Sequence, residues 1–237
     1  MTSNEGQGRA ATGARVWLAG ATGLVGRGVL ARLLERPEVA RVTALVRRPL
    51  GHAPSPKLEE RMVDFERLEA ALAGATATHV FCCLGTTIAV AGSEEAFRRV
   101  DHDYPLALGR AARAAGAGRL LVVTALGANA RSRIFYNRVK GDLENDLGAL
   151  GLPELHLFRP SLLLGERAEQ RRGERIGAAL AVPLGALLWG PLRKYRPIPA
   201  ASVAEAMVRV GLAPPAATGP AVTVHPSDDI AARAAAP

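Results

Sequence analysis

The feature that most constrains the fold is a glycine-rich turn between an apolar run and a helical pattern. The sequence reads RVWLAGATGLVGRGVLARLLER from 15 to 36. The first glycine lets the chain leave a strand, the second lets backbone N–H groups approach a pyrophosphate, and the third lets a helix pack closely on the sheet. The unpaired amides at a helix N-terminus also favour phosphate. The residues expected to hold a dinucleotide here are Gly20, Thr22, Gly23, Leu24, Val25 and Gly26.

Apolar runs alternate with helical patterns along the remainder of the 237 residues, and aromatic residues make up only 4%. This alternation predicts an α/β fold, a Rossmann-like doubly wound parallel sheet of about seven strands with helices on both faces. After the first strand, we expect strands at 42–46, 61–65, 79–84, 119–124, 154–158 and 221–225. Residues 1–14 are small and polar and predict a disordered leader, which leaves 15–237 as a single domain. Arginines flank a broken apolar stretch at 166–196, which we interpret as a small substrate cap.

The end of the second predicted strand carries two arginines and no carboxylate. An acidic side chain at this position would bind the ribose 2′-hydroxyl of NAD, whereas arginine accommodates the 2′-phosphate of NADP. Arg47 and Arg48 therefore favour NADP(H), with NAD(H) as the alternative and ordinary solvated charges as the other interpretation. Asp64 either meets the adenine or caps a helix that begins at Glu66. Further residues expected along the cofactor are Phe65, Leu84, Gly85 and Thr86.

Tyr136 and Lys140 lie four residues apart on one face of a predicted helix at 133–150. A tyrosine titrates near pH ~10, so its use as an acid and base near neutrality needs a fixed positive charge, which the lysine one turn away supplies. The same ammonium would reach the nicotinamide ribose. A hydroxyl at the end of the fifth strand would orient a substrate carbonyl, and either Thr124 or Ser132 fits. The other interpretation is a tyrosine ring packed on a lysine stem.

Other classes of site and partner receive little support from the sequence. Asp101, His102 and Asp103 are consecutive, so a helix cannot aim all three at one ion, and we expect no metal. The formal charge of +8 comes from scattered arginines, so we expect no nucleic acid, and no stable membrane insertion beyond weak surface contact. Cys82 and Cys83 are adjacent, which argues against a disulfide framework and predicts a cytoplasmic protein.

Five segments together resemble the short-chain dehydrogenase/reductase superfamily: GATGLVG at 20–26, the arginines after the second strand, TALGA at 124–128, YNRVK at 136–140 and RPSLLLG at 159–165. FCCLGTT at 81–87, FYNRVKGDLE at 135–144 and LFRPSLLLGER at 157–167 more specifically resemble atypical members akin to the Tat-interacting-protein oxidoreductases. The likeness runs from Arg15 to about residue 230. It implies an NADP(H)-binding sheet, Tyr136 as acid and base, Lys140 as its electrostatic partner, and Arg159, Pro160 and Ser161 near the nicotinamide.

The chain departs from the pattern of these relatives at the end of the fifth predicted strand, where they commonly carry a serine pair and this chain has Thr124 and Ala125. The turn is GxxGxxG instead of GxGxxG, as the resemblance to extended and atypical members implies. Because the glycine turn, the arginine pair and the pair of Tyr136 and Lys140 follow one another in the order that this chemistry needs, we expect an NADPH-dependent oxidoreductase acting on a carbonyl or alcohol of a small, partly apolar substrate, as a monomer or homodimer. The alternatives are an NADP(H)-binding regulator or redox sensor with little turnover, and an isomerase or epimerase that retains its cofactor.

Overall fold

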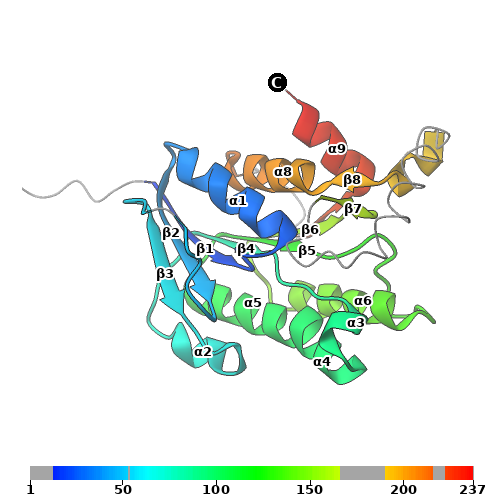
Figure 1. The fold of residues 1–237 in the computed structure, drawn as a ribbon, viewed down its shortest axis with the longest axis horizontal. Helices are drawn as coiled ribbons and strands as arrows, with labels where there is room; N and C mark the ends of the chain where they lie inside the picture. Colours follow the sequence, from blue (N-terminus) through cyan, green and yellow to red (C-terminus); the bar gives the residue numbers. More distant parts are fainter. Residues whose placement is uncertain (1–12, 53, 166–189, 216–221, 237) are drawn as a thin grey trace, which may run out of the picture.

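The fold is built on a parallel sheet of seven strands (Figure 1). The computed structural model describes residues 13–52, 54–165, 190–215 and 222–236. The strands are β1 (Ala14–Ala19), β2 (Val39–Val46), β3 (Leu58–Met62), β4 (His79–Cys82), β5 (Arg119–Val123), β6 (Glu154–Arg159) and β9 (Val222–Pro226), in the order β3-β2-β1-β4-β5-β6-β9. The order reverses between β1 and β4, the switch point at which doubly wound sheets bind ligands. The prediction of a Rossmann-like α/β fold is confirmed.

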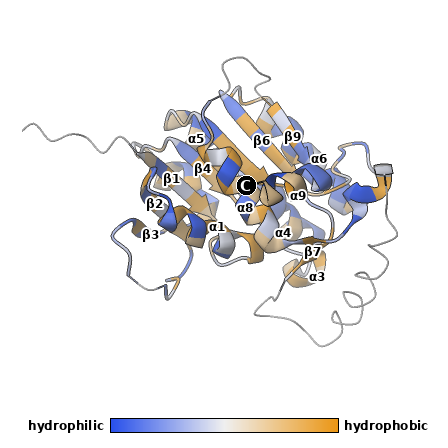
Figure 2. Cartoon of the chain, turned by 90° about the horizontal axis from the view of Figure 1, so that it is seen from above, coloured by the Kyte–Doolittle hydropathy of each residue, from blue (hydrophilic) through white to orange (hydrophobic). Residues whose placement is uncertain are grey.

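Helices cover both faces of this sheet. Above it in Figure 1 lie α1 (Leu24–Glu35), α8 (Ala200–Leu212) and α9 (Ser227–Ala235), and below it lie α2 (Leu68–Ala71), α5 (Tyr104–Ala114) and α6 (Phe135–Gly148). Figure 2 looks down on the upper layer, with α1, α8 and α9 over the strands. Val16 and Leu18 of β1 pack with the upper helices, whereas Trp17 and Ala19 pack with the lower ones. Burial of both faces explains why the strands read as continuous apolar runs.

Three short helical segments follow β4: α3 (Ile88–Ala91), α4 (Glu94–Arg98) and the π-helical η2 (Arg99–Asp103). Ser93 caps α4, because its Oγ accepts the Ala96 N–H at 3.1 Å. The Tyr104 N–H donates to the Arg99 carbonyl, which is five residues back instead of four. Pro105 has no N–H and lies in the first turn of α5, so the register changes there.

The position of β3 differs from the prediction by three residues. The strand spans Leu58–Met62, not 61–65, and it pairs with β2 through Leu58 and Val42. Its sequence, LEERM, is mostly polar because β3 lies at the edge of the sheet, so composition did not reveal it. Asp64 follows the strand and accepts the Glu66 N–H at 3.0 Å, which caps the 3₁₀ turn η1 (Phe65–Arg67). The capping alternative for Asp64 is therefore the one that the geometry supports.

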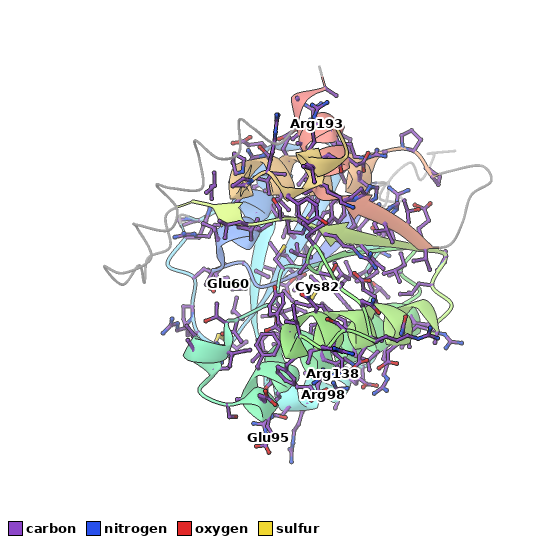
Figure 3. The ribbon with its side chains drawn as sticks, turned by 90° about the vertical axis from the view of Figure 1, so that its right-hand side faces the viewer. Glu60, Cys82, Glu95, Arg98, Arg138 and Arg193 are labelled. Atoms are coloured by element: carbon purple, nitrogen blue, oxygen red, sulfur yellow. The ribbon has the colours of Figure 1, made fainter. Side chains whose placement is uncertain are left out.

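A second, two-stranded sheet lies beside the main one and was not predicted. It pairs β7 (Leu163–Leu164) with β8 (Ile198–Pro199) in parallel, and the 3₁₀ helix η3 (Gly190–Tyr195) precedes β8. Figure 3 faces this side of the molecule, with Cys82 at its centre and Arg193 of η3 above. Most of the predicted cap, residues 166–189, lies outside the described residues, as do residues 1–12 of the predicted leader. Among the helices that the structure describes, none is long and apolar enough to cross a membrane.

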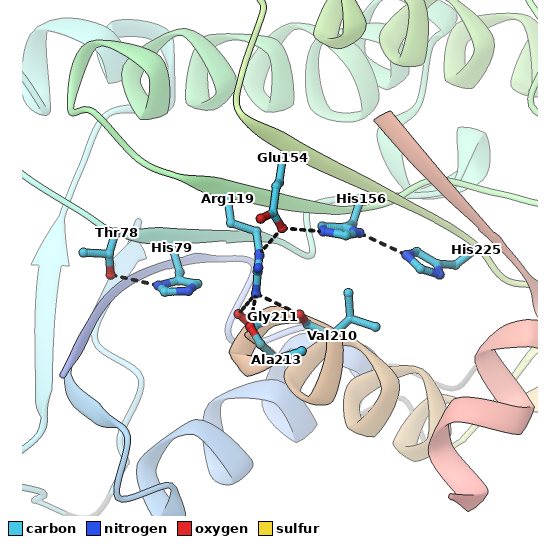
Figure 4. A network of polar contacts seen from close by, with 9 residues as sticks. All are labelled: Thr78, His79, Arg119, Glu154, His156, Val210, Gly211, Ala213 and His225. Carbon is cyan, nitrogen blue, oxygen red and sulfur yellow. Dashed lines mark hydrogen bonds and ion pairs between the residues drawn. The ribbon is translucent and has the colours of Figure 1, made fainter. Parts of the chain in front are cut away.

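A polar network joins the beginnings of β5 and β6 to the upper helices (Figure 4). The Arg119 guanidinium donates to Glu154 at 2.6 Å and to three carbonyl oxygens at the end of α8, those of Val210, Gly211 and Ala213, at 2.7–3.0 Å. A cation at a helix C-terminus satisfies carbonyls that have no partner within the helix and interacts favourably with the helix dipole. His156 continues the network to His225 of β9, with 3.1 Å between their ring nitrogens.

Candidate active site

The glycine turn between β1 and α1 has the close packing that the sequence predicts. Gly20 has φ +87°, and a Cβ there would lie 2.5 Å from the Cys83 carbonyl oxygen. A Cβ at Gly26 would collide with the Gly20 carbonyl. The first turn of α1, which begins after Gly23, has no capping side chain and no acidic residue. Its amide groups and positive dipole end therefore remain for an anion, which fits the pyrophosphate of a dinucleotide.

The remaining residues of the glycine turn differ in burial and in their contacts. Thr22 lies in the turn, Val25 is buried in the upper core, and Leu24 is half-buried against Gly165 at the end of the β6–β7 segment. Leu24 thus brings the start of α1 next to the second sheet.

Arg47 and Arg48 directly follow β2, and both are exposed. The nearby acidic residue Glu60 of β3 accepts the Leu50 N–H at 2.9 Å, so it fixes the loop after β2. Burial and Glu66 raise the pKa of Tyr104 to about 12, and the charges of Arg99 and Arg47 oppose that rise. Arg47, directly after β2, therefore lies within electrostatic reach of Tyr104, the first residue of α5.

The loop after β4 runs from Cys83 through Leu84, Gly85 and Thr86. The Thr86 N–H donates to the Asp101 Oδ2 atom at 2.8 Å, and a Cβ on Gly85 would lie 3.4 Å from Oδ1 of the same carboxylate. Asp101 therefore holds this loop in place. Burial raises the pKa of the Cys82 thiol to about 11 and that of Cys83 well above its ordinary value, so both thiols are neutral near pH 7.

Tyr136 and Lys140 occupy the first half of α6, where Tyr136 contacts α4 and Lys140 contacts η2. The Tyr136 ring packs against Phe97 of α4, with centroids 5.5 Å apart. Lys140 is only 3% exposed, and its Nζ lies 2.8 Å from the Asp101 Oδ1 atom. Burial alone would lower the pKa of Lys140, but the charges of Asp101 and Tyr136 outweigh it and raise that pKa. The lysine is therefore a buried cation within electrostatic reach of the Tyr136 hydroxyl.

The structure places Thr124 in an internal network instead of an open site. Thr124 is 4% exposed, and its hydroxyl donates to the Glu144 Oε1 atom at 2.6 Å. Glu144 also pairs with Arg159, whose Nε lies 3.0 Å from Oε1 and whose Nη2 contacts Oε2. Because its proton is already donated to Glu144, Thr124 cannot also donate it to a substrate carbonyl. Ser132 differs: its Oγ accepts the Ile134 N–H at 3.1 Å, which leaves the hydroxyl proton for donation.

The three residues expected near the nicotinamide, 159–161, follow β6 and take part in several internal bonds. Arg159 is held by Glu144, and the Pro160 carbonyl accepts the Leu126 N–H at 2.9 Å. The Ser161 hydroxyl donates to the Arg196 carbonyl, and its N–H donates to Ser227 of α9 at 3.2 Å. The side chains of Arg159 and Ser161 therefore take part in internal bonds at the edge of the site.

Sequence reasoning missed two members of the site. Glu144 lies one turn beyond Lys140 on α6, so extending the helical spacing of Tyr136 and Lys140 would have found it. Asp101 was considered only as a metal ligand, whereas it binds Lys140. Its neighbour His102 contacts Asp103 at 2.8 Å and Asp146 at 2.9 Å. In the part of the chain that the structure describes, no group of three or more His, Cys, Asp or Glu side chains is arranged to hold a metal ion.

The glycine turn, the strand order and the buried lysine at the switch point together define a dinucleotide-binding protein of Rossmann type. A family model described as NAD(P)H-binding matches residues 20–148. The mitochondrial protein fmp52 of Aspergillus fumigatus is 40% identical over 167 residues, which cover 68% of this chain and 71% of that protein. HTATIP2 of Rattus norvegicus is 35% identical over 162 residues, which cover 67% of this chain and 66% of that protein. The chain belongs to the NAD(P)H-binding family, as an atypical member related to short-chain dehydrogenases and reductases.

Solved structures confirm the fold of this family member. MoeE5 in complex with UDP-glucose and NAD superposes with a TM-score of 0.63 at 17% identity, covering 90% of this chain and 76% of that chain. At this identity the likeness shows the fold alone.

The expectation of a cytoplasmic protein is contradicted by the relatives, because the fungal proteins are named as mitochondrial. The inference rested on two unpaired cysteines. Reduced cysteines report a reducing environment and do not identify a compartment.

Proposed function

We propose that the protein is an NADPH-dependent oxidoreductase acting on a carbonyl or alcohol of a small, partly apolar substrate. The observation that carries the proposal is the placement of Tyr136 and the buried Lys140 on one face of α6, beside the loop after β4. The cofactor, when bound, supplies or accepts the hydride. In the reduction direction, the substrate carbon receives the hydride and its oxygen receives the proton of Tyr136 Oη. Water then returns a proton to the phenolate.

The chain's own residues have separate parts in this proposal. Gly20, Gly23 and the start of α1 hold the pyrophosphate. Lys140 is the buried cation on the same helix face, and its charge stabilises the phenolate that forms once Tyr136 has given up its proton. Ser132 takes the part of the orienting hydroxyl, because Thr124 donates its proton to Glu144.

Arg47 and Arg48 support a preference for NADPH, and their replacement tests it. We expect the Arg47→Ala/Arg48→Ala variant to lose at least about tenfold in NADPH affinity with little change for NADH, because only NADPH carries the 2′-phosphate that pairs with arginine. Cofactor titration by fluorescence measures both affinities. Arg41→Ala is the matched control, because its exposed guanidinium pairs with Glu59 at 3.1 Å. Tighter binding of NADH by the unaltered protein would contradict the preference.

Two other functions predict a result different from that of the reductase in one experiment. A redox-sensing regulator is favoured by the engagement of Thr124 with Glu144, and a cofactor-retaining isomerase is suggested by the fold shared with sugar-nucleotide proteins. Incubating a panel of small aldehydes and ketones with excess NADPH separates the reductase from both alternatives. Steady, stoichiometric NADPH oxidation supports the reductase, and the absence of oxidation with every member, despite tight NADPH binding, contradicts it.

A further inference from the structure

Asp101 and Lys140 form an ion pair that is almost completely removed from solvent. Their side chains are 1% and 3% exposed, and Lys140 Nζ lies 2.8 Å from Asp101 Oδ1. The other carboxylate oxygen accepts the Thr86 N–H at 2.8 Å. Burying two charges is costly and is repaid only where geometry and further hydrogen bonds are good. The pair therefore calls for an explanation beyond stability.

The backbone around Asp101 places its carboxylate at this point. Asp101 is the middle residue of the π-helical η2, where the chain is wound more loosely than in an α-helix. The carbonyl of Asp101 would be the partner of residue 105 in a regular α-helix, but Pro105 has no N–H. Such π-helical insertions in α-helices often occur at functional sites.

We propose that Asp101 is a positioning residue that neutralises the charge of Lys140, so that Tyr136 stays protonated at neutral pH and acts as a proton donor. The inference rests on the proposed function and adds a direction to it. A free lysine ammonium beside Tyr136 would favour the phenolate. An ammonium paired with a carboxylate favours it much less, because the two charges largely cancel at the phenol oxygen. The neutral phenol is the form that can give a proton to a carbonyl oxygen, which is the step needed in the reduction direction.

The other charged and titratable groups on the elements around Lys140 are neutral or paired elsewhere. Asp101 is therefore the group that offsets the charge of Lys140. Cys82 of β4 is neutral, because burial raises its pKa to about 11. Glu144, one turn further along α6, is paired with Arg159 of β6. His102 of η2 contacts Asp103 and Asp146. Phe97 of α4 presents an apolar ring to Tyr136.

The test is a pH titration of the Tyr136 hydroxyl, followed by tyrosinate absorbance in the protein without cofactor. Subtracting the same titration of a Tyr136→Phe version of each protein isolates the Tyr136 signal. Asp101→Asn keeps an oxygen for the Thr86 N–H but removes the charge. We expect Tyr136 to ionise about one pH unit or more lower in Asp101→Asn than in the unaltered protein. The matched control is Asp142→Asn on α6, the helix that carries Tyr136; its half-exposed carboxylate pairs with Arg98 of α4, and its replacement should leave the curve unchanged.

Two further variants complete the cycle and keep the test valid if Asp101→Asn fails to fold. In Lys140→Met, the unpaired Asp101 should move Tyr136 ionisation to higher pH. In the double variant Asp101→Asn/Lys140→Met, both charges are gone and ionisation should return to within about half a pH unit of the original. An unchanged or raised value in Asp101→Asn, or an unchanged value in Lys140→Met, overturns the proposal. The measurement needs no substrate, so a shifted curve without NADPH oxidation would contradict the proposed function and leave this inference standing.

Discussion

Replacing Tyr136 with phenylalanine is expected to lower turnover by at least about 10²-fold while leaving NADPH affinity within about twofold. General acid–base groups contribute roughly 10²–10⁴-fold, and phenylalanine removes only the hydroxyl that would transfer the proton. The ring contact with Phe97, at 5.5 Å between centroids, is kept, so the start of α6 should stay in place. Steady-state NADPH oxidation and fluorescence titration of the cofactor measure the two effects separately.

The fold of the Tyr136→Phe variant needs its own control, which thermal unfolding provides. An unchanged unfolding midpoint together with lost turnover assigns the loss to chemistry. Undiminished turnover in the variant would remove Tyr136 from the proposed role. Loss of NADPH binding together with turnover would indicate a packing role for the tyrosine instead.

Replacing Arg119 with alanine is expected to lower the free energy of unfolding by about 3–5 kcal/mol, the cost typical of removing one partner of a buried ion pair. Arg119 is 5% exposed, and its loss would leave Glu154 with only its 3.3 Å contact to His156 and three carbonyl oxygens at the end of α8 without the Arg119 donor. Denaturant unfolding measures the effect. The matched control is Arg41→Ala, which breaks an exposed pair with Glu59 and should cost less than about 1 kcal/mol.

The same pair makes the stability of the protein depend on pH. The Arg119 guanidinium, with a smaller contribution from His156, holds the pKa of Glu154 below its ordinary value of 4.5. The contribution of the pair is therefore present above pH 4.5 and is lost as the pH falls towards the lowered pKa. Arg119→Ala should flatten this part of the stability profile. Equal losses for Arg119→Ala and Arg41→Ala at neutral pH would contradict the importance of burial.

Local spacing allowed most of the framework to be predicted, and it singled out the Tyr136 and Lys140 pair. The glycine turn and the Tyr136 and Lys140 pair each lie within one or two neighbouring elements, where short-range geometry decides which side chains meet. The strand β3 was misplaced because an edge strand has no apolar pattern. Its polar sequence, LEERM, gives no signal of that kind.

The partners of the site residues could not be predicted in the same way. Asp101 meets Lys140, and Arg159 meets Glu144, only because η2 and β6 pack against α6. No spacing in the sequence records such contacts. Thr124 was expected at the right strand end, but which acceptor its hydroxyl meets depends on Glu144, a residue on a different element. Sequence spacing thus identified the candidate site residues, while tertiary packing determined which hydrogen-bond and ion-pair partners they have.

The Arg119 network and the Tyr136 site lie at opposite ends of the same strands. Arg119 is the first residue of β5, whereas the turn, the β4 loop and the residues after β6 all follow strand ends. The Arg119 network, which binds the end of α8, is therefore separate from the loops at the site. During evolution, side chains at the site end can be replaced to accept new substrates, at a cost in the free energy of unfolding. The Arg119 network at the other end would keep its own contribution to that free energy. A laboratory seeking a sturdier starting point for directed evolution should therefore strengthen the amino-terminal ends of the strands first.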